Sequence, residues 1–143
     1  MNVVLDTNVL VSGLLKTSGN PAKIVNLIVR REVILFLDSR IFSEYKEVLK
    51  RDKFMFNPEK ISVLLDYFKK IARFISPVPL NVRFVDPYDL PFYEVAKASD
   101  SYLITGNIKH FPKNDDKIFL SKNFIEFYKL RKMKMSDSKK SKK

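Results

Sequence analysis

The sequence predicts an α/β fold in which a mainly parallel sheet carries helices on both faces. Short apolar runs of strand length alternate along the chain with stretches that have helical periodicity. This alternation is typical of parallel sheets, and strands buried on both faces are almost wholly apolar. The chain has 143 residues, of which 45% are hydrophobic. This length and composition suit one globular domain with a substantial core.

The first half of the chain shows the alternation clearly. Residues 2–5 and 33–37 are almost wholly apolar and predict buried strands. Asn20 and Pro21 follow a polar loop and start a helix, because proline suits the first helical position. Asp38 follows the second apolar run, where a carboxylate can cap the next helix. The elements expected here are a strand at 2–5, helices at 7–15 and 20–31, a strand at 33–37, and a helix from 39 to about 53.

The second half continues the pattern with one interruption. Asn57 and Pro58 mark a helix start, and the apolar positions that follow repeat at helical spacing. Pro77 and Pro79 disfavour a central strand and instead predict a linker. The elements expected here are a helix at 57–75, a linker at 75–85 with a short strand at one or both ends, a turn at 86–89, a helix to about 98, strands at 102–105 and 117–120, and a helix at 121–130.

Positive charge is spread unevenly over the chain. The net charge is +11, of which residues 131–143 contribute +6 and residues 1–130 contribute +5. The Lys- and Ser-rich composition after residue 130 predicts a domain at 1–130 followed by a basic disordered tail at 131–143. A basic body favours a polyanion such as nucleic acid, although solubility alone also explains it. The tail either binds RNA phosphates without sequence preference or serves only as a solubilising end.

Several classes of protein are excluded by composition. The absence of cysteine excludes disulfides, thiolate catalysis and sulfur-ligated zinc. A single histidine excludes acid–base catalysis by a histidine pair, and no serine has a partner base for a triad. Three glycines leave no phosphate-binding loop. The longest apolar run, residues 33–37, is too short to cross a membrane, and the first residues lack a signal-peptide pattern. We therefore expect a cytoplasmic protein without a membrane partner.

Polar side chains gather at the ends of the predicted strands. Asp6 ends the first strand, Asp89 opens the helix before the strand at 102–105, and Asn107 follows that strand. Ligands of open parallel sheets bind beyond the carboxyl ends of the strands, so these three side chains should face one crevice. Each residue also has an ordinary explanation. Asp6 and Asp89 suit helix N-caps, and Asn107 after glycine suits a turn.

Glu44 reaches the same region from the predicted helix after residue 39. At about 100° per residue, the apolar residues of this helix cover an arc of roughly 120°. Glu44 lies about 40° outside that arc and Glu47 about 100° outside it. Glu44 therefore borders the buried face, where it either reaches a pocket or lies on the helix surface, whereas Glu47 should point to water.

Acids gathered without neighbouring cations favour a bound metal ion. Like charges about 4 Å apart repel by several kcal/mol at an effective dielectric constant near 20. Carboxylate oxygens without histidine or cysteine suit Mg²⁺ or Mn²⁺ rather than zinc. Such ions activate water and neutralise a phosphate during an in-line displacement. A basic protein with an acidic, metal-binding crevice is thus suited to phosphodiester hydrolysis.

The motifs at these positions resemble those of the PIN-domain family over about residues 1–130. The opening run VVLDTNVL at 3–10 is similar to the opening strand and Asp-Thr-Asn signature of that family. The later segments resemble one PIN subgroup, often labelled as toxin components of toxin–antitoxin pairs. These segments are DPYDLPF at 86–92, Ala96, YLITGN at 102–107 and HFP at 110–112.

The resemblance implies a three-layer α/β/α sandwich and a metal-dependent endoribonuclease. It assigns Asp6, Glu44 and Asp89 as catalytic metal ligands for Mg²⁺ or Mn²⁺. Asn107 falls on a fourth catalytic position, where many members have aspartate, which puts full occupancy of a second metal site in doubt. Thr7, Asn8 and Thr105 match supporting positions.

The resemblance also implies partners, and the surrounding residues suggest further roles. RNA is the expected substrate, an antitoxin protein is an expected partner, and a homodimer is common among similar domains. The apolar helices at 20–31 and 57–75 are candidate interfaces. We interpret Asp86 as a turn former and His110 as a structural loop residue.

Three hypotheses stay open at this point. The first is a metal-dependent endoribonuclease, the toxin of a type II toxin–antitoxin pair. The second is a catalytically inactive PIN-fold module that binds RNA or acts as a scaffold. The third is a DNA-directed nuclease of the flap-cleaving type, which the short chain disfavours because it lacks long insertions for threading DNA.

Overall fold

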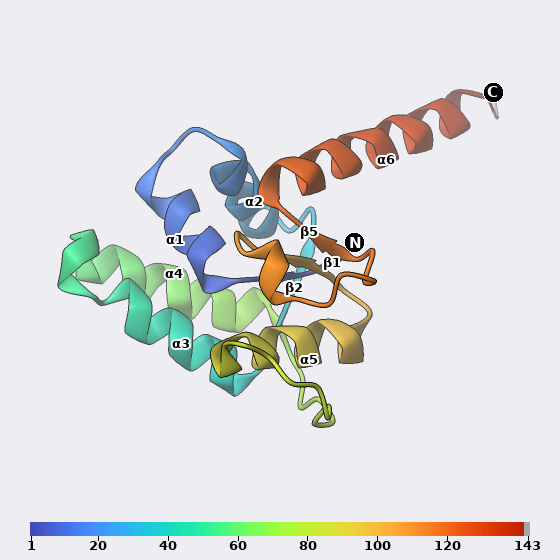
Figure 1. Cartoon of the computed structure of the whole chain (residues 1–143). Coiled ribbons are helices and arrows are strands. Elements are labelled where there is room, and N and C mark those ends of the chain that lie inside the picture. The colour runs from blue at the N-terminus through green and yellow to red at the C-terminus, as the bar shows by residue number, and fades with distance from the viewer. Residues whose placement is uncertain (142–143) are drawn as a thin grey trace.

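The computed structural model describes residues 1–141, which form a three-layer α/β/α sandwich (Figure 1). The predicted fold class is therefore confirmed. The elements, in chain order, are β1 (Asn2–Leu5), α1 (Thr7–Leu15), α2 (Asn20–Val29), β2 (Ile34–Leu37), α3 (Ser39–Leu49), η1 (Asp52–Phe54), α4 (Pro58–Ile71), β3 (Arg73–Phe74), η2 (Pro87–Asp89), α5 (Leu90–Ser99), β4 (Tyr102–Ile104), η3 (Ile108–His110), β5 (Ile118–Phe119) and α6 (Ser121–Ser141).

The sheet places β1 at its centre. Within the described residues the strand order is β3-β2-β1-β4-β5, and every neighbouring pair is parallel. The chain leaves β1 for β2 on one side and later enters β4 on the other side. The boundary between β1 and β4 is therefore a topological switch point, where a crevice opens beyond the carboxyl ends of the strands. Leu5 pairs with Ile104 across this boundary, so Asp6 lies at the mouth of the crevice.

Helices cover both faces of the sheet. In Figure 1, α2 and α6 lie on one side of β1 and α5 lies on the other. The helices α1 and α2 pack closely because Gly13 has no side chain. A Cβ atom at Gly13 would lie 2.7 Å from Val25 Cγ2 and 2.8 Å from the carbonyl oxygen of Pro21. This close approach sets the position of α1, which begins directly after Asp6.

The core holds α3 against the end of β1. Tyr45 is fully buried, and its hydroxyl donates a hydrogen bond to the carbonyl oxygen of Leu5. Its ring also packs edge-on against Phe68 of α4, with ring centroids 6.5 Å apart. Because Tyr45 adjoins Glu44 and Leu5 adjoins Asp6, this contact brings two of the predicted site residues toward each other.

Three helices end earlier than the sequence predicts. The helix α4 ends at Ile71 rather than near residue 75, and β3 follows it directly. The helix α2 ends at Val29 rather than near residue 31, where Arg31 has a positive φ of 61°. The helix α3 ends at Leu49 rather than near residue 53, and a short 3₁₀ turn follows it. Met55 closes that turn with a positive φ of 54°. Turn conformations of this kind leave little trace in the pattern of apolar residues, so periodicity overestimates helix length.

The last helix is longer than predicted. The sequence predicts an end near residue 130 and a disordered tail, whereas α6 continues to Ser141. Lys, Arg and Met are good helix formers, and no glycine or proline interrupts this stretch. The division into a domain at 1–130 and a basic tail at 131–143 stays a prediction, and residues 142 and 143 lie outside the described residues. Among residues 1–141, no helix is long and apolar enough to cross a membrane.

Candidate active site

A cavity of about 640 Å³ opens beyond the carboxyl end of β1. Residues of α1, α3, η1, η2 and α5 line it, and Asp6, Glu44 and Asp89 are all among them. Five carboxylates and two cations line this one space. They are Asp6, Glu44, Glu47, Asp86 and Asp89, together with Arg51 and Lys53. The lining is thus net negative in a chain whose overall charge is +11.

Asp6 is held by the neighbouring strand and not by its own helix. Its backbone N–H donates to the carbonyl oxygen of Ile104 at 2.9 Å, which continues the β1–β4 pairing. Its carboxylate accepts a hydrogen bond of 2.7 Å from the Thr105 hydroxyl and makes no helix-capping bond. Asp6 is only 5% exposed. Capping of α1 therefore does not explain this buried carboxylate.

Glu44 and Asp89 each accept one hydrogen bond from another segment. The Thr7 hydroxyl donates to Glu44 Oε2, which joins α3 to the first turn of α1. His110 Nδ1 lies 3.1 Å from Asp89 Oδ2. Asp89 is 7% exposed, and its side chain does not cap α5. The simple N-cap explanation fails for this residue as well.

The three carboxylates are electrostatically strained in the absence of a cation. Burial, together with the smaller effects of the charges on Asp89 and Glu44, raises the pKa of Asp6 to about 6, and the hydrogen bond from Thr105 opposes this rise. Burial also raises the pKa of Glu44, with the Thr7 hydrogen bond opposing it and Asp89 adding to it. Burial raises the pKa of Asp89, opposed by His110 and reinforced by Asp86. A nearby positive charge would relieve all three groups.

The remaining predicted residues take different positions. Asn8 lines the cavity beside Thr7. Asn107 is exposed and does not line the cavity. Its backbone N–H donates to Thr105 Oγ1 at 3.0 Å. Thr105 is fully buried and therefore links the backbone after β4 to the carboxylate of Asp6. Asn107 therefore lies next to Thr105 and not beside the carboxylates in the cavity.

The chemistry of these donors fits a hard divalent cation. Asp6, Glu44 and Asp89 offer carboxylate oxygens only, which suits Mg²⁺ or Mn²⁺. Their raised pKa values show that this cavity favours added positive charge. In the part of the chain that the structure describes, no three acidic or histidine side chains stand close enough together to hold an ion as they lie. Each of the three instead accepts a hydrogen bond from Thr105, Thr7 or His110.

Arg40 joins α3, which carries Glu44, to α5, which begins directly after Asp89. Its guanidinium contacts Asp38 Oδ2 at 2.7 Å and Glu94 Oε1 at 2.8 Å. Asp38 caps α3 by accepting the N–H of Ile41 at 2.9 Å, as the sequence predicts. Glu94 lies on α5 and also accepts the N–H of Leu80 at 2.7 Å. Both carboxylates are almost fully buried, so Arg40 fixes α3 and α5 relative to each other.

We expect Arg40→Met to destabilise the protein by about 2–4 kcal/mol, because it leaves two buried carboxylates without their cation. This range lies below that for a fully buried pair because the Arg40 side chain is 46% exposed. Urea denaturation would measure the loss, with Arg83→Met on the exposed part of the linker as the matched control. A loss equal to that of the control would contradict a bridging role for Arg40.

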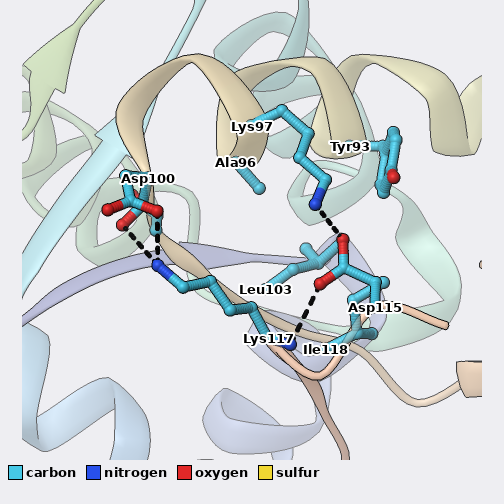
Figure 2. A pocket seen from close by; sticks show the side chains of 9 residues that line it. Tyr93, Ala96, Lys97, Asp100, Leu103, Asp115, Lys117 and Ile118 are labelled. Atoms are coloured by element: carbon cyan, nitrogen blue, oxygen red, sulfur yellow. Dashed lines mark hydrogen bonds and ion pairs between the residues drawn. The ribbon is translucent and has the colours of Figure 1, made fainter.

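The loop after β4 is anchored so that His110 reaches Asp89. Phe111 is 3% exposed and packs against Phe84 and Tyr93, with ring centroids 5.6 and 6.5 Å away. Asp115 pairs with Lys97 of α5 and accepts the N–H of Lys117 (Figure 2).

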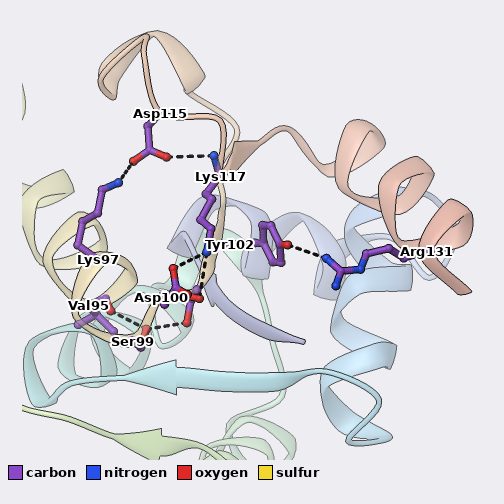
Figure 3. Close-up of polar contacts among 9 residues, drawn as sticks. Val95, Lys97, Ser99, Asp100, Tyr102, Asp115, Lys117 and Arg131 are labelled. Carbon is purple, nitrogen blue, oxygen red and sulfur yellow. Dashed lines mark hydrogen bonds and ion pairs between the residues drawn. The ribbon is translucent and has the colours of Figure 1, made fainter. Parts of the chain in front are cut away.

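Lys117 in turn pairs with Asp100 at the end of α5, and Arg131 of α6 donates to the Tyr102 hydroxyl at 3.0 Å (Figure 3). The end of the segment that leads into β5 is thus attached to α5, and the start of β4 is attached to α6. The sequence predicts only a structural loop residue at position 110, whereas the structure adds a contact between His110 and Asp89.

Several residues at the cavity mouth were not predicted from the sequence. Arg51, Lys53 and Phe54 line the cavity and belong to no motif. Tyr88 also lines it, and it lies within the segment DPYDLPF without a role assigned to it from the sequence. One available signal was Tyr88 itself, an aromatic residue within the polar turn before Asp89. Glu47 points outward, as predicted, with its side chain 72% exposed and 3.3 Å from Arg51.

Comparison with known proteins places this site in a family. A sequence profile described as "PIN domain" matches residues 2–109, which include Asp6, Glu44 and Asp89. The chain belongs to the PIN domain family. PIN domains are nucleases, so the family indicates a hydrolase that acts on nucleic acid.

Two similar proteins extend the comparison. This PIN domain is 30% identical over 131 residues to the uncharacterized protein MJ1680 of Methanocaldococcus jannaschii, covering 87% of this chain and 83% of that protein. It also resembles the crystal structure of VapBC2 from Rickettsia felis bound to a DNA fragment from their promoter. That match has a TM-score of 0.55 at 20% identity and covers 84% of this chain and 97% of the other. At this identity the likeness concerns the fold alone.

Proposed function

We propose that this PIN domain is a metal-dependent endoribonuclease that hydrolyses phosphodiester bonds of RNA. The observation that carries the proposal is the strand-end cavity, in which Asp6, Glu44 and Asp89 are partly or fully buried with raised pKa values. Charge strain of this kind at one end of the sheet is typical of a functional site. A purely structural cluster would be stabilised by its own cations, as Asp38 and Glu94 are by Arg40.

Each residue has a defined role in this proposal. Asp6, Glu44 and Asp89 would hold Mg²⁺ or Mn²⁺, which supplies a Lewis acid that neutralises phosphate charge and activates water. Thr105 and Thr7 orient the carboxylates of Asp6 and Glu44 by donating hydrogen bonds. Asn8 lies on the lining where it can contact the substrate. Asn107 supports Thr105 through its backbone, and its amide adds no negative charge to the cavity.

The partners expected from the sequence belong to the same proposal. We propose that the protein is the toxin of a type II toxin–antitoxin pair and that an antitoxin protein restrains it in the cytoplasm. The structural likeness to VapBC2 supports the proposed toxin–antitoxin role only through the shared fold. A homodimer through apolar helix surfaces is part of the same expectation.

Incubation of RNA with the purified protein tests this function. We expect cleavage in Mn²⁺ or Mg²⁺, none in excess EDTA, and at least about a 100-fold lower rate for Asp89→Asn, because one electrostatic contribution to the transition state is lost. Asp116→Asn, in the exposed loop before β5, serves as the matched control.

Two outcomes separate the other hypotheses. RNA binding without metal-dependent cleavage would favour the inactive RNA-binding or scaffold module. Preferential cleavage of flap DNA over RNA would favour the DNA-directed nuclease.

A further inference from the structure

We propose that the mouth of the cavity is a binding subsite for one unpaired nucleotide, whose base stacks on Tyr88 while its phosphate contacts Lys53 and Arg51. This inference rests on the proposed function, because it specifies how a nucleic-acid strand approaches the acids. It adds to that function a place on this chain, made by Tyr88, Lys53 and Arg51, that would hold one nucleotide of the strand.

Tyr88 is an aromatic ring held in water beside the cavity. It is 73% exposed and lines the cavity next to Asp89. Among the described residues, no other aromatic ring packs against it. An exposed ring with a free face is the feature on which proteins stack the bases of single strands.

The turn that carries Tyr88 is well defined. The Asp86 carboxylate accepts the N–H of Tyr88 at 3.0 Å, and the Asp86 carbonyl oxygen accepts the N–H of Asp89 at 3.1 Å. Pro87 restricts the backbone between them. Asp86 is therefore the turn former that the sequence predicts. Because the turn is already ordered, stacking on Tyr88 costs little conformational entropy.

Lys53 and Arg51 are the cations among the cavity-lining residues, and they come from the segment that follows α3. The Arg51 side chain is 47% exposed and pairs loosely with the exposed Glu47 at 3.3 Å. Lys53 Nζ lies 5.0 Å from the centre of the Phe54 ring. An exposed ion pair such as Arg51–Glu47 and an exposed cation–π contact such as Lys53–Phe54 each contribute little stability. Both cations therefore stay available for a phosphate.

Tyr88, Lys53 and Arg51 lie nearer the surface of the cavity than the buried acids. Asp6 and Asp89 are 5% and 7% exposed, whereas Tyr88 is 73% exposed. Asp6 and Asp89 thus lie at the floor of the cavity, and the ring and the two cations lie at its mouth. In a duplex, the face of each base is covered by its neighbours, so the ring can stack only on a base that is unpaired and unstacked. The arrangement therefore favours a single strand whose backbone enters toward the floor.

The test measures binding without cleavage. A fluorescent single-stranded RNA oligonucleotide and its duplex would be titrated with the full chain in EDTA by fluorescence anisotropy. We expect Tyr88→Ala to weaken single-strand binding about 10-fold and Tyr88→Phe to stay within about 2-fold of the parent, because phenylalanine keeps the stacking face. Thermal unfolding of each variant checks that the fold is intact.

The contact between Lys53 and a phosphate is tested by the salt dependence of single-strand binding. Each phosphate contact contributes about 0.7 to the slope of log K against log salt for a single strand. We expect Lys53→Gln to reduce this slope by about 0.7 and Lys60→Gln, an exposed change on α4 away from the cavity, to leave it unchanged. Equal slopes for the two variants would overturn the phosphate contact.

Failure of the subsite and failure of the proposed function give different results. If Tyr88→Ala binds the single strand as tightly as the parent while the parent still cleaves RNA with metal, the subsite is wrong and the function stands. If the duplex binds as tightly as the single strand, the subsite is also wrong. Tyr88-dependent binding without metal-dependent cleavage would leave the subsite in place and reject the nuclease.

Discussion

Replacing Asp6 by asparagine is expected to remove RNA cleavage and, at the same time, to stabilise the metal-free protein at pH 7. Cleavage should fall at least about 100-fold, because the amide cannot supply the negative charge that holds a divalent cation. The folded protein should gain about 1–3 kcal/mol of unfolding free energy. The upper bound of this gain in unfolding free energy follows from the pKa of Asp6, which is raised, mainly by burial, from 3.8 to about 6.

The stability gain has a defined pH dependence. Because the folded pKa of Asp6 lies above its unfolded value, the stability contributed by the protonated carboxyl is fully present below about pH 4 and is lost as pH rises through about 6. Asparagine does not titrate. The difference in unfolding free energy between Asp6→Asn and the parent should therefore widen from about pH 4 to about pH 7.

Urea unfolding in EDTA across this pH range measures the difference, and an RNA cleavage assay measures the loss of activity. Asp66→Asn, an exposed change on α4, is the matched control and should alter neither. Loss of activity together with loss of stability would instead indicate that Asp6 serves the fold. Such a result would remove the main support for a metal-binding role.

Adding Mn²⁺ or Mg²⁺ is expected to raise the unfolding temperature of the parent protein. A ligand that binds only the folded state at 100 times its dissociation constant adds about 2.7 kcal/mol. For a domain of this size, that corresponds to roughly 8 °C. The physical reason is that the cation replaces the repulsion among Asp6, Glu44 and Asp89 with attraction.

Scanning calorimetry with and without metal gives this shift directly, and it requires no substrate. The shift should be nearly absent in Asp6→Asn and unchanged in Asp66→Asn. An equal shift in all three proteins would show that the ions bind elsewhere, because the two variants differ only in whether the cavity loses an acid.

The position of each site residue was predictable to a different degree. Asp6 was predicted from its place at the end of the first strand, and Asp89 from its place at the start of the helix that leads into β4, since both positions face the carboxyl edge of a parallel sheet. Glu44 followed from its angle at the border of the apolar face of α3, and the structure leaves it half-buried against Thr7. Its partner hydroxyl was not predictable, because no local pattern relates residues 37 positions apart.

The contact of His110 with Asp89 and the exposure of Tyr88 could not be predicted from local sequence patterns. His110 reaches Asp89 because Phe111 is buried between Phe84 and Tyr93, and no spacing rule connects these segments. Tyr88 was read only as part of a turn, and its free face became visible only through its 73% exposure beside the cavity.

The sequence by itself determined the parallel α/β architecture and the edge of the sheet at which chemistry gathers, because apolar runs, helical periodicity and strand-end acids are local properties. Tertiary structure alone decided which side chains meet there. The order β2-β1-β4 brings Thr105 to Asp6, and the Tyr45–Leu5 hydrogen bond brings α3 and Glu44 to the same cavity. These contacts join residues that are far apart in the chain, so they depend on how the core packs as a whole.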